Sequence, residues 1–384
     1  MNQTSLLNAD DVRPNTTDVD SSSVAGVIST VIPAVFVRYT WTEFASVHAP
    51  LSIQVDRYLT PIIYIIGLTG NLLALIVWME KRMRQNNSSA IYLVALSCSD
   101  FVFLVLHIVI ELRYAWGIRT LSYPVVCELY FLVYLAPQYL SPILVLGFTV
   151  ERYISICHPF RREKFCTTKR ATKVVAALAF GSLLLSSVQG YFWTYNPAKK
   201  TCDMRPTVAE GGQASIKSIW NLVTELLIFI FVPLFVLFFN ILVIKEIHHI
   251  TKTTRALDPG HHHKGAASTI MLLTVSFYLI ITVLPATVVY LLETTISEGN
   301  HNMTDDQIRN DPSWQSYIFY ITSRKIVEEF ALSHYACNIF LYLATGPQFR
   351  KAVVDNFKSV WNSRKSSLAT YSEVQTRHTN ITKV

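Results

Sequence analysis

Seven apolar stretches, each about as long as a membrane-crossing helix, set the pattern of hydrophobic and polar positions along the chain. A helix needs about 20 predominantly apolar residues to cross the hydrocarbon core of a bilayer. The stretches are Tyr58 to Met79, Ser89 to Ile110, Leu129 to Val150, Val174 to Tyr195, Leu226 to Ile244, Ala266 to Leu292 and Tyr317 to Ala344. The last stretch carries charged residues in its first half and is apolar from Phe330 onward. The pattern predicts an all-α membrane protein built as a seven-transmembrane helix bundle.

Composition agrees with a chain that folds largely in lipid. Of its 384 residues, 51% are hydrophobic and 15% are charged, compared with roughly 25% charged residues in soluble domains. We expect an extracellular tail at residues 1–56, the bundle at 57–345 and a cytoplasmic region at 346–384. The apolar segment Val24 to Val37 is too short to span and follows Asp18 and Asp20, so it is interpreted as tail and not as a signal peptide.

The distribution of basic residues predicts the orientation. Near the ends of the stretches, 19 Lys and Arg residues lie on one side and 9 on the other, and the richer side is normally cytoplasmic. The loops after the first, third and fifth helices are therefore expected inside, and the N-terminus outside. The net charge of +7 follows from these loops, so no nucleic-acid partner is expected.

Glycosylation and cysteine usage fit this topology. Sequons at Asn2, Asn15 and Asn302 lie on the outer side, where glycosylation takes place, whereas those at Asn86, Asn87 and Asn380 lie inside and are interpreted as chance matches. Six cysteines without a C-x-x-C pair predict neither a disulfide scaffold nor a zinc site. They are sufficient for a single structural disulfide.

Ionisable residues inside the stretches are costly in lipid and are candidates for function. Asp100 is either a helix-packing hydrogen-bond acceptor or a conformational hub that could hold a sodium ion, with Asn71 and Asn338 as partners. His107 and Glu111 follow at helical spacing and share its face. In the third helix, Tyr134 and Gln138 lie on one face together with Arg152. These faces are expected to point into the bundle.

The motifs together resemble the rhodopsin-like G-protein-coupled receptors, over nearly all of the seven helices. They are Gly70-Asn71, Leu96 to Asp100, Glu151-Arg152-Tyr153, Pro233, Pro285 and Asn338 to Tyr342. The resemblance implies that Asn71, Asp100, Asn338 and Tyr342 form the conformational hub and that Cys127 pairs with Cys202. It also implies a short cytoplasmic helix from Pro347 to Phe357.

Several family positions differ in this chain. The fourth helix lacks the usual tryptophan, Val283 stands where many members have a tryptophan, Ile339 replaces a proline and Ile241 replaces a tyrosine. Similar losses occur among invertebrate neuropeptide receptors. Cys157-His158-Pro159, Phe165-Cys166-Thr167 and Arg170-Ala171 look like the FMRFamide-receptor group.

The resemblance also assigns roles at the cytoplasmic side. Glu151 is expected to pair with Arg152, and outward movement of the sixth helix would free Arg152 to contact the C-terminal helix of a G-protein alpha subunit, with Tyr153 completing the site. The alternative is a pair of charges that only marks the membrane interface. Hydroxyl residues between Ser363 and Thr382 are expected to be phosphorylated by receptor kinases and to recruit arrestin; the alternative is a merely polar tail.

Charges of both signs are expected around one outer pocket, which suits a peptide better than a lipid. The candidate ligand-binding residues are Glu111, Arg113, Tyr134, Gln138, Glu225, Arg324, Lys325 and Glu328. Tyr134 stands where amine receptors of this family carry an acid. Leu332 stands where opsins carry a lysine. An amidated neuropeptide is expected, with Glu111 or Glu328 accepting its amide or arginine groups. The alternative for the seventh-helix charges is solvent-facing pairs at i to i+3 and i+4.

Other function classes find less support in the sequence. A receptor for a small non-peptide ligand is the nearest alternative, and a transporter would show matching broken helices in two halves, which the chain lacks. His107 and His334 have no convergent ligands at metal-binding spacing. We therefore expect a plasma-membrane receptor and no enzyme, cofactor or metal.

Overall fold

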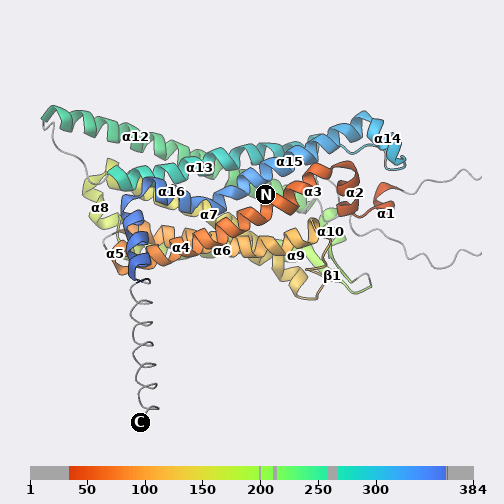
Figure 1. Cartoon of the computed structure of the whole chain (residues 1–384), viewed down its shortest axis with the longest axis horizontal. Helices are drawn as coiled ribbons and strands as arrows, with labels where there is room; N and C mark the ends of the chain where they lie inside the picture. Colours follow the sequence, from red (N-terminus) through yellow and green to blue (C-terminus); the bar gives the residue numbers. More distant parts are fainter. Residues whose placement is uncertain are drawn as a thin grey trace, which may run out of the picture.

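The computed structural model describes residues 34–85, 87–198, 200–210, 214–257, 266–359 and 361. Long helices lie side by side along one axis, with short elements gathered at both ends (Figure 1). We call the end that carries the N-terminal segment and the strands the outer end, and the opposite end the inner end. The predicted sequons at Asn2 and Asn15 and the hydroxyl residues of the tail fall outside the described residues.

The described residues form seven long helical runs. The first is α3 (Pro50–Gln54), η2 (Val55–Leu59) and α4 (Thr60–Met79), followed by α6 (Ser88–Tyr114), α7 (Val126–Cys157) and α9 (Thr168–Phe192). The fifth is α11 (Ile216–Glu225), η4 (Leu226–Phe231) and α12 (Val232–Leu257), the sixth is α13 (Ala266–Leu291), and the seventh is α15 (Pro312–Ala336) with α16 (Asn338–Thr345). The first six are long and apolar enough to cross a membrane. The chain is a seven-transmembrane helical bundle, as the hydrophobic pattern predicts.

Several helix limits differ from the predicted ones. The first run begins at Pro50 and not at Tyr58, and the fifth begins at Ile216 and not at Leu226. The fourth helix ends at Phe192, because the next residues form β1 (Trp193–Asn196). The outer turns carry polar and charged side chains that face the protein, so a count of apolar residues does not include them.

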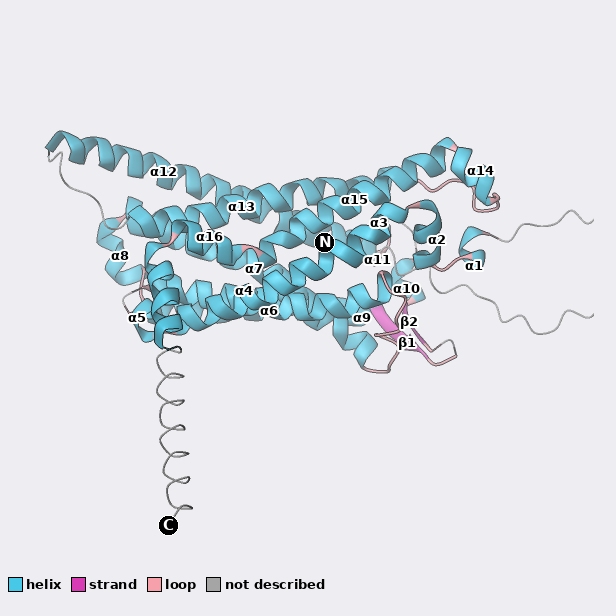
Figure 2. Ribbon diagram, in the orientation of Figure 1, coloured by secondary structure: helices cyan, strands magenta, loops and turns pink. Residues whose placement is uncertain are grey.

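A disulfide fastens the strands to the third helix. Strand β1 pairs antiparallel with β2 (Thr201–Met204), with Tyr195 opposite Cys202, and lies beside the outer ends of α9 and α10 (Pro206–Ala209) (Figure 2). Cys127 in the first turn of α7 is bonded to Cys202, with 5.4 Å between their Cα atoms. The pairing implied by the family resemblance is present.

The segment before the first helix is folded against the outer end. It contains α1 (Val35–Arg38) and α2 (Trp41–His48), which lie beside α14 (Asp305–Asn310) and the loop before it. The amide of Val35 donates to the carbonyl of His301 at 2.8 Å, and the Tyr39 hydroxyl donates to Asp305 at 2.7 Å. Phe44 packs against Trp314 with ring centroids 5.4 Å apart. Part of the predicted tail is thus a fixed cap.

The inner end carries the predicted short helix. Residues 347–359 are helical, and α5 (Lys81–Arg84) and α8 (Pro159–Phe165) lie in the neighbouring loops. Arg82 donates to Asp355 at 2.8 Å, and Asn356 donates to Glu80. These contacts join the start of the C-terminal region to the first inner loop.

The seventh run is interrupted although it lacks the family's proline. Helix α15 ends at Ala336, Cys337 adopts φ −91° and ψ 1°, and α16 restarts at Asn338. A Cβ added to Gly70 would lie 2.7 Å from Ile339, and one added to Gly67 would lie 2.9 Å from the Cβ of Ala336. The two glycines therefore allow α4 to approach the interruption closely.

Candidate functional site

Asp100, predicted as a conformational hub or a packing residue, is fully buried and joins three helices. Its Oδ1 accepts from the Ser141 hydroxyl at 2.6 Å, and its Oδ2 accepts from the Asn338 amide at 2.9 Å. Asn71 instead donates to the carbonyl of Tyr335 at 2.7 Å, in the last turn of α15, where helix carbonyls need side-chain donors. Of the two predicted partners, Asn338 therefore reaches Asp100 and Asn71 does not, while Ser141 was not predicted.

Tyr342 completes this inner region. It is fully buried on α16 and packs edge-on against Trp78, with ring centroids 5.6 Å apart. Both carboxylate oxygens of Asp100 accept hydrogen bonds from protein. No group of three His, Cys, Asp or Glu side chains suited to a metal occurs in the parts of the chain that the structure describes.

Two serines of α6 hold the charged end of α7. Arg152 donates to the Ser89 hydroxyl at 2.6 Å, and Glu151 accepts from Ser88 and, at 3.5 Å, from Ser89. Ser89 thus connects the acid and the base that the sequence places side by side. The ring centroid of Tyr153 lies 5.2 Å from that of Phe239 on α12, so Tyr153 contacts α12 whereas Glu151 and Arg152 contact α6.

The charges of the seventh helix are buried at the outer end. Arg324 donates to Glu328 at 2.7 Å and lies 3.1 Å from Glu293, while its guanidinium is 5.3 Å from the ring centre of Tyr290. Lys325 lies 3.1 Å from Asp56 and 3.7 Å from Glu328. The side chains of Arg324, Lys325 and Glu328 are 6%, 10% and 13% exposed. The predicted i to i+3 and i+4 pairs are present, but they do not face solvent.

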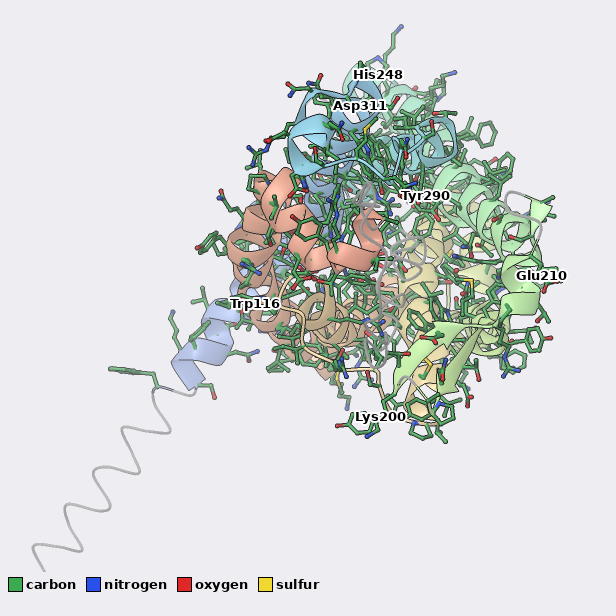
Figure 3. All side chains as sticks on the ribbon, turned by 90° about the vertical axis from the view of Figure 1, so that its right-hand side faces the viewer. Trp116, Lys200, Glu210, His248, Tyr290 and Asp311 are labelled. Carbon is green, nitrogen blue, oxygen red and sulfur yellow. A yellow bond between two sulfur atoms is a disulfide. The ribbon has the colours of Figure 1, made fainter. Side chains whose placement is uncertain are left out.

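Figure 3 views the molecule from this end. Trp116, Lys200, Glu210 and Asp311 lie around the rim, and Tyr290, which contacts Arg324, lies nearer the middle of the view. The buried charges are therefore set within the ring of helices.

Three acids of this cluster were not among the predicted site residues: Asp56, Glu293 and Glu329. Asp56 was assigned to the tail, but it lies in η2, is 1% exposed and pairs with Lys325. Glu329 is 5% exposed and accepts from the Thr60 hydroxyl at 2.8 Å. The sequence signal for Asp56 was its position directly before an apolar stretch, in a chain whose seventh stretch carries two adjacent bases.

Aromatic and polar side chains lie below the charges. The ring of Phe103 stacks on Tyr134 at 5.5 Å, and the Tyr64 hydroxyl is hydrogen-bonded to His107 Nδ1 at 2.7 Å. A cavity of about 20 Å³, which suffices for one water molecule, is lined by Phe103, His107, Tyr134, Gln138, Lys325, Glu328, Glu329 and Leu332. Four of the eight predicted ligand-binding residues therefore line one cavity.

The other four predicted residues lie around it. Glu111 is one turn above His107 and is 3% exposed, and Glu225 on α11 is 2% exposed and interacts electrostatically with Arg324. Arg113 is half-buried near the outer end of α6 and does not line the cavity. The structure brings seven of the eight residues into the buried interior and leaves Arg113 closer to the surface.

The cap holds a histidine beside an acid. His48 is 9% exposed, and its Nε2 lies 3.6 Å from Asp305, with Tyr39 and Phe44 packed on its ring. Burial lowers the pKa of His48, although the carboxylate of Asp305 acts in the opposite direction. The hydrogen bond to Asp305 raises the pKa of Tyr39. The imidazole of His48 is therefore neutral in the folded cap at pH 7.

Comparisons with known proteins agree with this geometry. The family described as 7 transmembrane receptor (rhodopsin family) matches residues 70–343. The pyrokinin-1 receptor of Drosophila melanogaster is 31% identical over 119 residues, which are 30% of this chain and 26% of that protein. The neurotensin receptor type 1 of Homo sapiens is 27% identical over 128 residues, which are 32% of this chain and 31% of that protein. The nematocin receptor 2 of Caenorhabditis elegans is 28% identical over 222 residues, which are 53% of each protein. The matches thus span about a quarter to about half of these relatives.

Proposed function

Because the chain belongs to the rhodopsin family of seven-transmembrane receptors, we propose that it is a plasma-membrane G-protein-coupled receptor for an extracellular neuropeptide, and specifically for an amidated one. Its similarity to receptors whose names include pyrokinin, neurotensin and nematocin supports a peptide ligand. The segment before the first helical run at Pro50 and Asn302 then face outside, and residues 346–384 face the cytoplasm.

The buried ion cluster at the outer end is the observation that carries this proposal. Buried ion pairs add little net stability, because the cost of desolvation nearly cancels their attraction. A lipid pocket would be lined by apolar groups, whereas this cavity is lined by Lys325, Glu328 and Glu329 beside Tyr134 and Gln138. Side chains of both signs next to aromatic rings suit the amide groups and charged side chains of a peptide.

The inner end offers a place for a G protein. Ser89, Glu151 and Arg152 form a held cluster, and a groove of about 510 Å³ lies between α12 and α13, lined by Ile247, His248, Ile270 and other residues. Outward movement of α13 would widen this groove, and Arg152, once separated from Ser89 of α6, would contact a helix of the G-protein alpha subunit. Receptor kinases and arrestin would then act on the tail.

The test is ligand-evoked G-protein dissociation in cells that express this chain. The panel contains amidated neuropeptides, their free-acid forms, amines, lipids and nucleotides. We expect a response to an amidated peptide below about 1 µM, lost in Arg152→Ala and retained in Arg161→Ala, which removes an exposed base from the same end. A response confined to amines, lipids or nucleotides would refute the peptide proposal, and equal potency of the free-acid peptide would refute amidation.

A further inference from the structure

Carboxylates outnumber cations at the outer end of the seventh helix. Asp56, Glu111, Glu328 and Glu329 are all close enough to interact electrostatically with the single ammonium group of Lys325. Only Asp56 and Glu328 lie within ion-pair distance of it. Arg324 does not offset the difference, because it is already shared between Glu293 and Glu328.

The four acids differ in how many of their carboxylate oxygens have a hydrogen-bond or ion-pair partner. Both oxygens of Glu328 are engaged, one by Arg324 and the other by Lys325. By contrast, Oδ1 of Asp56, Oε1 of Glu111 and Oε2 of Glu329 have no hydrogen-bond partner among the described residues. These three side chains belong to residues that are 1%, 3% and 5% exposed. Buried carboxylate oxygens without donors are costly, and a bound cation with several N–H groups removes that cost.

Three different helical runs supply the unsatisfied oxygens. Asp56 lies on η2, Glu111 on α6 and Glu329 on α15. A group that bonds to all of them needs donors pointing in several directions in one unit. Guanidinium has five N–H donors in a rigid plane, whereas ammonium is a compact point charge, and one ammonium is already present in Lys325.

Building on the proposed receptor function, we propose that Asp56, Glu111 and Glu329 form a subsite for a guanidinium group of the ligand. Lys325 partly neutralises this subsite before the ligand binds. Lys325 and Glu329 also line the cavity of about 20 Å³, which is smaller than a guanidinium group, so the lysine side chain moves aside when the ligand enters. Glu328 is a positioning residue that holds Arg324 and Lys325 and does not contact the ligand's cation.

The test uses the purified full-length chain and a probe that needs no knowledge of the natural ligand. The probe is argininamide, and its control is citrullinamide, which has nearly the same shape and the same α-amino group but a neutral urea in place of the guanidinium. At 10-fold excess over its dissociation constant, argininamide is expected to raise the melting temperature by about 2 °C, whereas citrullinamide leaves it unchanged. Glu111→Gln and Glu329→Gln are each expected to weaken argininamide binding at least about 10-fold, because each removes one charged acceptor.

Glu210→Gln is the matched control. Glu210 is an exposed acid at the same end of the molecule (Figure 3), so its replacement is expected to leave argininamide binding intact. Glu111→Gln is nearly isosteric and removes an unsatisfied buried charge, so its melting temperature without probe is expected to equal or exceed that of the native chain. Equal effects of argininamide and citrullinamide, or unchanged binding in both glutamine variants, would overturn the subsite.

This outcome is separable from that of the proposed function. Argininamide binding that depends on Glu111, in a receptor that answers only non-peptide cations, would keep the subsite and refute the peptide ligand. A peptide response of equal strength in the native chain, Glu111→Gln and Glu329→Gln, with no argininamide binding, would keep the receptor function and refute the subsite.

Discussion

Replacement of Lys325 by methionine tests whether the outer ion cluster is as desolvated as the structure indicates. The lysine ammonium lies 3.1 Å from Asp56, whose side chain is 2% exposed, and 3.7 Å from Glu328. Glu328 keeps Arg324 as a partner in this variant, so Asp56 is the residue whose buried charge loses its ion pair. Removing one partner of a buried pair costs about 3–5 kcal/mol, because the other charge stays buried alone.

The expected result is a fall in melting temperature of about 4–6 °C for Lys325→Met. The double variant Asp56→Asn, Lys325→Met is expected to recover most of this loss, since no buried charge of the pair remains, with a coupling free energy of about 2 kcal/mol or more. The assay is thermal unfolding of the purified full-length chain, followed by circular dichroism. Arg82→Met is the matched control, because Arg82 pairs with Asp355 in solvent and its replacement is expected to change the melting temperature little.

Two results would refute this reasoning. The first is a melting temperature of Lys325→Met equal to that of Arg82→Met, which would mean that water reaches the pair. The second is a double variant as unstable as the two single losses added together, which would mean that the two residues stabilise the fold independently and not through one another.

Three further predictions concern other parts of the molecule. Ser89→Ala removes the acceptor of Arg152 at 2.6 Å and is expected to raise basal G-protein signalling several-fold at equal surface expression; unchanged basal signalling would contradict this role of the serine. Burial lowers the pKa of His48, so the unfolded cap binds a proton more readily than the folded cap, and cap stability is full above about pH 6.5 and falls as the pH decreases below it. The protection factors of the amides in residues 41–48, which are corrected for the intrinsic pH dependence of exchange, are expected to fall at pH 5.5, and to fall less in His48→Gln. Cys127→Ser removes a disulfide that links residues 75 positions apart, which corresponds to about 4.5 kcal/mol of stability in the chain-entropy model. A large fall in surface expression and in melting temperature is therefore expected, and an unchanged melting temperature would exclude a structural role of the disulfide.

The long helices were predictable because lipid imposes a simple requirement. A spanning segment must be helical and predominantly apolar, so the six uninterrupted stretches identify their helices. Their ends were less predictable: the turns from Pro50 and from Ile216 contain polar residues that are buried by other parts of the protein. Whether a polar residue faces water or protein depends on tertiary contacts, which a local pattern does not contain.

The candidate site was predictable in its charges and not in its pairings. The i to i+4 spacing of Arg324 and Glu328 favoured both a pocket and a solvent-facing pair, and only their burial, at 6% and 13% side-chain exposure, distinguishes the two. The roles of Ser89 and Ser141 carried no sequence signal, because serine hydroxyls in helices commonly bond to their own backbone. Their partners Arg152 and Asp100 lie 63 and 41 residues away.

The seventh helical run connects the outer cluster to the inner hub. Lys325 and Tyr335 are ten residues apart on α15, about 15 Å along the helix axis, and Asn338 follows the interruption at Cys337. Tyr335 accepts from Asn71 through its carbonyl and donates to the carbonyl of Gln138, while Asn338 donates to Asp100. A ligand cation that displaces Lys325 from Asp56 changes the forces on the outer half of this run, and the interruption is where its two halves can reorient relative to one another. The signal would then reach Asp100 through one helical run, and the isoleucine at 339 is compatible with this because the break in the helix is present without the proline.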